Sequence, residues 1–342
     1  MNKEPPLVCI CIPTYNAAAT IRETLESILA QTYSNLVVHI VDNASTDKTL
    51  EIARSMADPR IQVHSHESNI GAEGNFTRCI QMAAGAYTAI FHADDLYGPD
   101  MVAKQVAFLE SHPGAGVVFT EADMIDEDGQ KIGAITFPVG GTSLGDQISL
   151  ADLFKLILRY SNFLVCPSAM LRTSVYLDEI AVWRGDMFGT GADLDVWLRV
   201  ARKHDVGILS ERLMRYRIST TQGTQALRER TTRGDFFRVV DHYLAQDAVR
   251  NMLTPRDLNN YSRLERTDKA VRAANLFLQE RHEEAGVLCQ EVLVPDALAA
   301  AAESRRGLIT LLLAACIRAC IMLRLQAPGK LLLRHIRSFI KK

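Results

Sequence analysis

The chain has 342 residues, of which 48% are apolar and 23% charged, the proportions of an ordinary folded protein long enough for two domains. Its net charge of −2 hides an asymmetry, because residues 304–342 hold nine Lys or Arg and no Asp or Glu, while the first 303 residues carry −11. The seven cysteines include no CxxC pair, which argues against a structural zinc site. No secretory signal pattern precedes the first apolar run, which argues against export. We expect a cytoplasmic protein with a basic tail that meets an anionic surface.

Strand and helix patterns alternate through the first 120 residues. Short apolar runs bounded by turn residues predict buried strands at Leu7–Ile12, Leu36–Val41, Ile61–His64, Ala86–Phe91 and Gly116–Thr120. Amphipathic patterns predict helices at Ile21–Leu29, Lys48–Ala57, Ala72–Ala84 and Pro99–Ser111, the first of them opened by a Thr20–Glu23 capping box. This alternation predicts an α/β fold with a Rossmann-like, doubly wound and mostly parallel sheet.

The pattern changes after Thr120. A hairpin-like turn at Asp126–Gly129 and a glycine-rich segment at Gly140–Gly145 come first. Further predicted elements are a helix at Ser149–Tyr160, a strand at Val165–Leu171, a helix at Ala192–Arg202 and a strand at Leu213–Ile218. A mostly helical sequence then follows, so we place a boundary near Gln225, between a domain of residues 1–225 and a helical region of residues 226–342.

The basic tail contains two apolar patterns. Leu308–Ile317 is too short to span a bilayer, and its extension to Leu325 would bury Arg318 in lipid. Lys330–Lys342 predicts a helix with basic residues on one side and apolar residues on the other. Such a helix either lies in an anionic membrane surface or docks on the folded protein. Nucleic-acid binding is not expected, because the segment contains no recognised module.

Two adjacent carboxylates, Asp94 and Asp95, follow the predicted strand Ala86–Phe91. Ligands bind at the carboxyl ends of strands in open α/β sheets, and neighbouring carboxylates raise one another's pKa unless a cation is present. Mg²⁺ or Mn²⁺ bridging a diphosphate would satisfy the pair, whereas a solvated turn is the simpler alternative. The loops Pro13–Asn16 and Asp42–Asp47 follow two other strands and should lie on the same rim. A dinucleotide-binding GxGxxG and a P-loop are both missing from the sequence.

Six motifs occur in family-like order and spacing: Cys9–Asn16 (CICIPTYN), Ile40–Asp47 (IVDNASTD), Asn69–Gly71 (NIG), Phe91–Asp95 (FHADD), Gly191–Arg199 (GADLDVWLR) and Tyr216–Arg217. The series resembles the family 2 glycosyltransferases of the GT-A fold, of the kind that build bacterial surface polysaccharides. The resemblance covers roughly the first 225 residues. It implies an enzyme that moves a sugar from a nucleotide-diphosphate donor to a saccharide acceptor, which the basic tail suggests is lipid-linked.

The resemblance implies a role for specific residues in donor binding. Asp42 lies where the family hydrogen-bonds the nucleobase, and a carboxylate suits the ring N–H of uracil or thymine. As an alternative, Asp42 could cap the helix that begins near Lys48. The positions carried over to nucleotide and donor binding are Pro13, Thr14, Tyr15, Asp42, Asn69, Asp94 and Arg217.

Metal binding and catalysis are likewise implied by the resemblance. Asp94 and Asp95 match the metal-binding acidic motif, with His92 at its first position, so Mn²⁺ or Mg²⁺ is the expected cofactor. Asp193 matches the base of an inverting, single-displacement transfer, and Asp195 is a second candidate. As an alternative, both carboxylates could serve only to stabilise the N-terminal end of a helix through the helix dipole.

Three departures from the family pattern, His92, Ala192 and Ser219, keep a catalytically inactive scaffold as an alternative. A nucleotidyltransferase is another, although the glycine-rich phosphate loop of that class is missing. The enzyme is expected at the inner face of the cell membrane as a peripheral protein.

Overall fold

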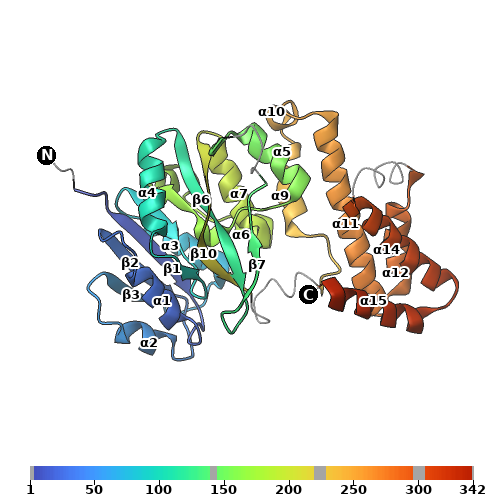
Figure 1. Cartoon of the computed structure of the whole chain (residues 1–342), viewed down its shortest axis with the longest axis horizontal. Helices are drawn as coiled ribbons and strands as arrows, with labels where there is room; N and C mark the ends of the chain where they lie inside the picture. The colour runs from blue at the N-terminus through green and yellow to red at the C-terminus, as the bar shows by residue number, and fades with distance from the viewer. Residues whose placement is uncertain (1–3, 139–144, 219–228, 296–304, 341–342) are drawn as a thin grey trace. The chain divides into compact units, whose positions relative to one another are not determined.

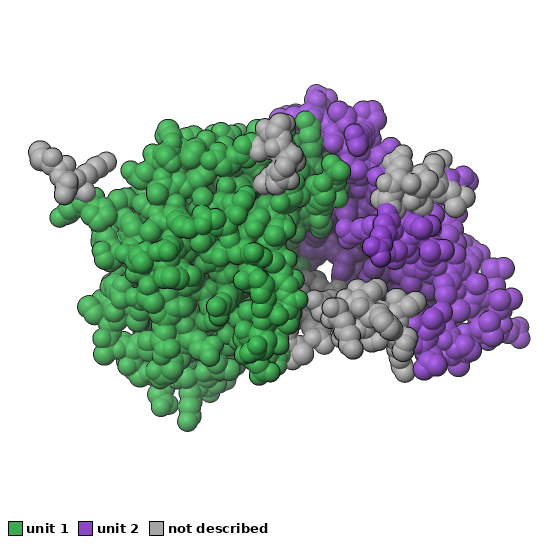
Figure 2. All heavy atoms as spheres, in the orientation of Figure 1, with its two compact units in different colours: residues 1–219 green, residues 220–342 purple. Residues whose placement is uncertain are grey.

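The chain folds into two compact units, residues 1–219 and 220–342, shown in separate colours in Figure 2. The computed structural model describes residues 4–138, 145–218, 229–295 and 305–340. The boundary predicted near Gln225 and the glycine-rich segment up to residue 144 lie outside these residues, as do Ser219 and its neighbours up to residue 228.

The first unit is built on one ten-stranded sheet with the strand order β3-β2-β1-β4-β9-β6-β10-β5, in which β7 also pairs with β6 and β8 with β10. Figure 1 labels β1, β2, β3, β6, β7 and β10 of this sheet. The strands are β1 (Val8–Thr14), β2 (Leu36–Asp42), β3 (Ile61–Ser65), β4 (Tyr87–Ile90), β5 (Leu96–Tyr97), β6 (Ala115–Ile125), β7 (Lys131–Ile135), β8 (Gln147–Ile148), β9 (Met170–Arg172) and β10 (Asp205–Arg217). Strands β3, β2, β1 and β4 pair in parallel. Because β9 is antiparallel to both β4 and β6, and β10 is parallel to β6, strands β4, β6 and β10 also share one direction. The mostly parallel α/β sheet is therefore confirmed.

Helices of the first unit cover the sheet with apolar faces. They are α1 (Ile21–Leu29), α2 (Thr49–Ser55), α3 (Gly71–Gln81), α4 (Met101–Ser111), α5 (Leu150–Tyr160), α6 (Gly185–Phe188) and α7 (Ala192–Ala201). Ile21, Leu25 and Ile28 of α1 are fully buried, as their spacing along one helix face requires. They join the strand residues Ile10 and Val38 in the main hydrophobic core.

Two predicted strands differ from the observed elements. Only Met170–Arg172 of the run Val165–Leu171 is a strand, because a 3₁₀ turn at Cys166–Ser168, with Pro167 inside it, comes first. The strand predicted at Leu213–Ile218 is the last part of the thirteen-residue β10. The predicted turn at Asp126–Gly129 does join two antiparallel strands, β6 and β7.

The second unit is helical, which confirms the predicted C-terminal helical region. Its helices are α9 (Asp235–Leu244), α10 (Asp247–Arg250), α11 (Pro255–Leu278), α12 (His282–Val292), α14 (Arg305–Met322) and α15 (Gln326–Ile340). Phe277, Cys289, Ile317 and Leu333 share one buried core, so α11, α12, α14 and the start of α15 pack together. Within the described ranges, no helix has the length and apolar character needed to cross a bilayer.

The start of the predicted tail helix docks on its own unit. Leu333 is buried, and Lys330 forms an ion pair with Glu280. The side chains from residue 334 onward, which include most of the predicted basic face, lie outside the described ones.

Gly98 connects β5 to β10 at a point where only a hydrogen atom fits. Its N–H donates to the Leu213 carbonyl at 2.7 Å, and an added Cβ would lie 2.7 Å from that same oxygen. Because the obstacle is backbone, Gly98→Ala should force β5 away from β10 and lower the free energy of unfolding by about 1–3 kcal/mol. Chemical denaturation measures this. Gly145→Ala, where an added Cβ meets no atom within 4 Å, is the control and should change little.

Candidate active site

The carboxyl ends of the parallel strands gather the predicted site residues on one rim of the sheet. Thr14 ends β1 and Asp42 ends β2, and the two are direct partners in the register of these strands. The acidic motif follows β4, and Arg217 ends β10. This convergence follows from strand direction, since the ends of parallel strands meet at one edge.

Asp42 presents a buried carboxylate oxygen to this rim. The side chain is fully buried, and its Oδ2 accepts a hydrogen bond from the Ser45 N–H at 3.0 Å. Its Oδ1 has no hydrogen-bond partner among the described residues. An unsatisfied buried oxygen is costly, and a ligand N–H would remove that cost. The alternative role as a cap of α2 fails, because the Thr49 N–H at the start of that helix donates to Asp47.

The other residues assigned to the donor differ in their exposure. Tyr15 is half exposed, whereas Thr14 is buried and its hydroxyl donates to the Ile12 carbonyl at 2.9 Å. Pro13 is partly buried in β1. Tyr15 can therefore reach a ligand with its ring, while the Thr14 hydroxyl is already used by the protein.

Asn43 is a residue that sequence reasoning did not single out. Its amide is buried and donates to Asn69 Oδ1 at 2.9 Å and to the Gly71 carbonyl at 3.0 Å. Its Oδ1 accepts from the Ile70 N–H and from Arg78 Nη1, each at 3.0 Å. Asn43 thereby ties the loop after β2 to the start of α3. The signal was its place directly after Asp42 in the IVDNASTD motif.

His92, Asp94 and Asp95 form a cluster whose candidate ligand atoms all lie within 4.8 Å of one another. Within the described part of the chain, His92 Nε2 and Asp95 Oδ2 are buried without a hydrogen-bond partner. Burial, followed by the neighbouring charge of Asp94, raises the pKa of the Asp95 carboxyl well above its usual range. Burial also lowers the pKa of His92, which favours the neutral imidazole that binds metals. An imidazole and two carboxylates, two of them with unsatisfied atoms, fit a divalent cation such as Mn²⁺.

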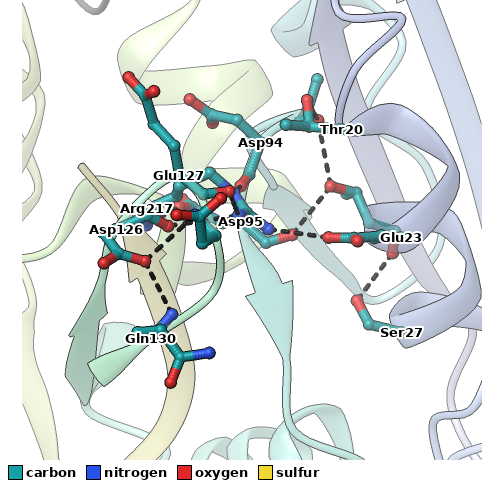
Figure 3. A network of polar contacts seen from close by, with 12 residues as sticks. Thr20, Glu23, Ser27, Asp94, Asp95, Asp126, Glu127, Gln130 and Arg217 are labelled. Carbon is teal, nitrogen blue, oxygen red and sulfur yellow. Dashed lines mark hydrogen bonds and ion pairs between the residues drawn. The ribbon is translucent and has the colours of Figure 1, made fainter. Parts of the chain in front are cut away.

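Arg217 holds this motif in place from the end of β10 (Figure 3). Its backbone N–H donates to Asp95 Oδ1 at 2.8 Å, and its Nε donates to the Asp94 carbonyl at 2.8 Å. Its Nη1 reaches the carbonyls of Asp126 and Glu127, and its Nη2 forms an ion pair with Glu23 at 2.9 Å. Four of the five guanidinium N–H groups are thus committed to the protein. The geometry favours a positioning role over the donor binding predicted for Arg217.

The predicted capping box at Thr20 and Glu23 is wrong, because both side chains serve the acidic motif instead. Thr20 makes no capping hydrogen bond to α1, and its hydroxyl donates to the Ala93 carbonyl at 2.9 Å. Glu23 turns to Arg217, as Figure 3 shows. The Thr24 hydroxyl, 2.9 Å from the Asp95 carbonyl, adds a further tether from the same helix. One face of α1 therefore supports the loop that carries Asp94 and Asp95.

Asp193 lies at the start of α7 with a perturbed carboxylate. Burial raises its pKa to about 6, against the hydrogen bonds from the Leu194 N–H at 2.6 Å and from Asn162 Nδ2 at 3.1 Å. Burial, followed by the charges of Asp193 and Asp95, raises the pKa of the partly buried Cys166 thiol, so both carboxylates lie near that residue. A carboxylate with a pKa near 6 is ionised at neutral pH and can still accept a proton.

Asp195, the second candidate base, is fully buried. Its Oδ2 pairs with Arg199 Nε at 2.9 Å, and its Oδ1 lies 3.7 Å from Arg184 Nη1. Arg199 in turn donates to the Ile180 and Val182 carbonyls. Asp195 therefore connects α7 to the segment before it, and its ion pairs favour a structural role.

The Arg217 network makes a prediction about metal affinity. Arg217→Met removes four hydrogen bonds from the residues around Asp94 and Asp95, so we expect the apparent Kd for Mn²⁺ to rise by about 10–100-fold. Isothermal titration calorimetry measures it. Glu23→Gln removes only the ion pair and should have a smaller effect. Arg215→Met, an exposed arginine on the same strand, is the control. An unchanged Kd in a folded Arg217→Met protein would contradict the positioning role.

Comparisons with known proteins identify the family of the N-terminal half of the chain. Residues 9–176 match the model of Glycosyl transferase family 2. "Putative glycosyltransferase EpsE" of Bacillus subtilis is 38% identical over 129 residues, which cover 37% of this chain and 46% of that relative. The chain thus spans less than half the length of this curated relative.

Solved structures show the same fold. TarS 1–349 of S. aureus in complex with UDP-GlcNAc has a TM-score of 0.60 at 17% identity, covering 92% of this chain and 90% of that one. The mannosyltransferase PcManGT of Pyrobaculum calidifontis in complex with GDP-Man and Mn²⁺ has a TM-score of 0.54 at 18% identity, covering 93% and 86%. Residues 9–176 are therefore a family 2 glycosyltransferase domain, and the first unit has the GT-A fold.

Proposed function

We propose that the protein transfers a sugar from a nucleotide-diphosphate donor to a saccharide hydroxyl with inversion at the anomeric carbon. The observation that carries the proposal is the cluster of His92, Asp94 and Asp95, which lies beyond the carboxyl end of β4 on the same rim as Asp42. Structural neighbours in complex with UDP-GlcNAc and with GDP-Man and Mn²⁺ support a nucleotide-sugar donor and a divalent cation.

His92, Asp94 and Asp95 would hold Mn²⁺ or Mg²⁺. A bound cation supplies the Lewis acid that offsets charge on the departing diphosphate. Asp42 Oδ1 would accept the ring N–H of the nucleobase, and Tyr15 would pack its exposed ring against the donor. Asn69, locked by Asn43, would shape the loop beside the nucleotide.

Asp193 would act as the general base. It accepts the proton of the acceptor hydroxyl while that oxygen attacks the anomeric carbon and the bond to the diphosphate oxygen breaks. One displacement of this kind inverts the configuration and needs no covalent intermediate. The hydrogen bonds from Asn162 and from the Leu194 N–H hold the carboxylate in one orientation.

The acceptor that we propose is a saccharide carried on a lipid, as in the synthesis of a bacterial surface polysaccharide. Nine cations and no acid in residues 304–342 support peripheral attachment to an anionic membrane at its inner face. A scaffold without activity is the competing function, suggested by the sequence departures at His92, Ala192 and Ser219.

A donor screen tests the transfer. UDP-, dTDP- and GDP-sugars are supplied with Mn²⁺, and release of free nucleotide diphosphate is measured. We expect Asp94→Ala and Asp193→Ala each to lower kcat/KM at least about 100-fold for the accepted donor, within the range for loss of a general base. Asp178→Ala, an exposed carboxylate in the same unit, is the control. Mn²⁺-dependent binding of a nucleotide without turnover of any donor would favour the scaffold.

The pKa of Asp193 predicts an acidic limit to activity. A general base works in its ionised form, so kcat/KM should fall about tenfold per pH unit below a pKa of about 6 and level off above it. Asn162→Ala removes a hydrogen bond that lowers this pKa, so the limb should move to higher pH. Asn35→Ala, at the opposite end of β2 from Asp42, should leave the limb unmoved. A profile that is flat through pH 6 would contradict the role of Asp193.

A further inference from the structure

Helix α14 of the second unit has an apolar face that no described part of the chain covers. Its outward side chains repeat at helical spacing, and the apolar surface continues into the turn after the helix. We call this surface the α14 stripe; its large members are Leu308, Ile309, Leu312, Met322, Leu323 and Leu325, each 45–70% exposed.

Two polar residues in the body of α14, Thr310 and Arg318, turn away from the stripe. The Thr310 hydroxyl lies 3.1 Å from that of Thr267 on α11, and Arg318 Nη1 donates to the Gly286 carbonyl on α12 at 3.3 Å. Leu311, Ala314 and Ile317 fill the core on that inner side. Arg318 therefore lies on the side of the helix that faces α12, away from the stripe.

Cations flank the stripe at both ends. Arg305 and Arg306 are exposed at the start of α14, and Arg324 is exposed in the turn that follows it. An eighteen-residue helix is roughly 27 Å long, so these charges stand about that far apart. Residues 304–342 contain no Asp or Glu to balance them.

We propose that the α14 stripe docks on an anionic lipid leaflet, with α14 lying in the interface and its terminal arginines on the headgroups. An apolar face with arginines at both of its ends matches acyl chains beneath negative headgroups. A second copy on the same surface would bring the arginines of two chains together, which is unfavourable. The proposal deepens the membrane attachment proposed above, and it assigns that attachment to α14 rather than to the residues after Lys330.

Vesicle binding by the full chain tests the proposal without donor or acceptor. Vesicles of phosphatidylcholine alone and of phosphatidylcholine with phosphatidylglycerol are sedimented with the protein. We expect binding to the anionic vesicles, and Ile309→Glu with Leu312→Glu should weaken it at least about tenfold. Arg305→Gln with Arg306→Gln should weaken it by about fivefold per arginine and reduce its salt dependence. Ile132→Glu, an equally exposed apolar position on β7, is the control.

The proposal is overturned if the native chain stays in the supernatant with anionic vesicles, or if the glutamate pair binds like the control. An oligomer in light scattering that the glutamate pair disperses, without lipid binding, would assign the stripe to a second copy. Because the substituted side chains are exposed, thermal melting should be unchanged. Nucleotide release with a water-soluble acceptor should persist in the glutamate pair, so loss of lipid binding and failure of the transferase proposal give different results.

Discussion

The guanidinium of Arg217 is the interaction on which the arrangement of the candidate site depends. It is almost completely buried, so each N–H left without an acceptor would cost free energy. The fold supplies those acceptors from three directions: the loop after β4, the hairpin between β6 and β7, and Glu23 on α1. Satisfying one buried cation thus fixes the relative positions of three segments that meet beside Asp94 and Asp95.

The same residue type suits four different roles because its surroundings differ. Asp195 is paired with arginines, which suits a structural role, while Asp42 keeps one buried oxygen without a partner among the described residues. Asp95 lies beside Asp94 with a raised pKa, which suits a cation. Among the described residues Asp193 accepts hydrogen bonds from neutral donors, Asn162 and the Leu194 N–H, and its pKa of about 6 suits a base. The role that suits each aspartate depends on whether the cost of burying its carboxylate is offset by a cation, by an N–H donor or by neither.

Much of the fold could be predicted from local sequence, because the strands of the first half are short apolar runs closed by turn residues. The convergence of Thr14, Asp42 and Asp94 on one rim followed from strand direction alone. What could not be predicted depends on partners distant in the sequence. Thr20 and Glu23 match a capping box, yet their side chains bond to residues more than 70 positions away. Glu23 pairs with Arg217 instead of capping α1, because leaving a buried charge unpaired would cost more free energy than a cap worth about 1 kcal/mol.

Helix α14 is a second case in which the local sequence does not predict the arrangement of the side chains. Its sequence is apolar around most of its circumference, so periodicity does not separate the core face from the outer face, and the few polar residues mark the inner side. Ordinarily a polar residue marks the solvent side of a helix. Here Thr310 and Arg318 find partners on α11 and α12, and this leaves the outward face to leucine and isoleucine. A helix that directs its polar groups inward and its apolar groups outward is built for an apolar environment outside the protein, and the arginines at its ends require that environment to carry negative charge.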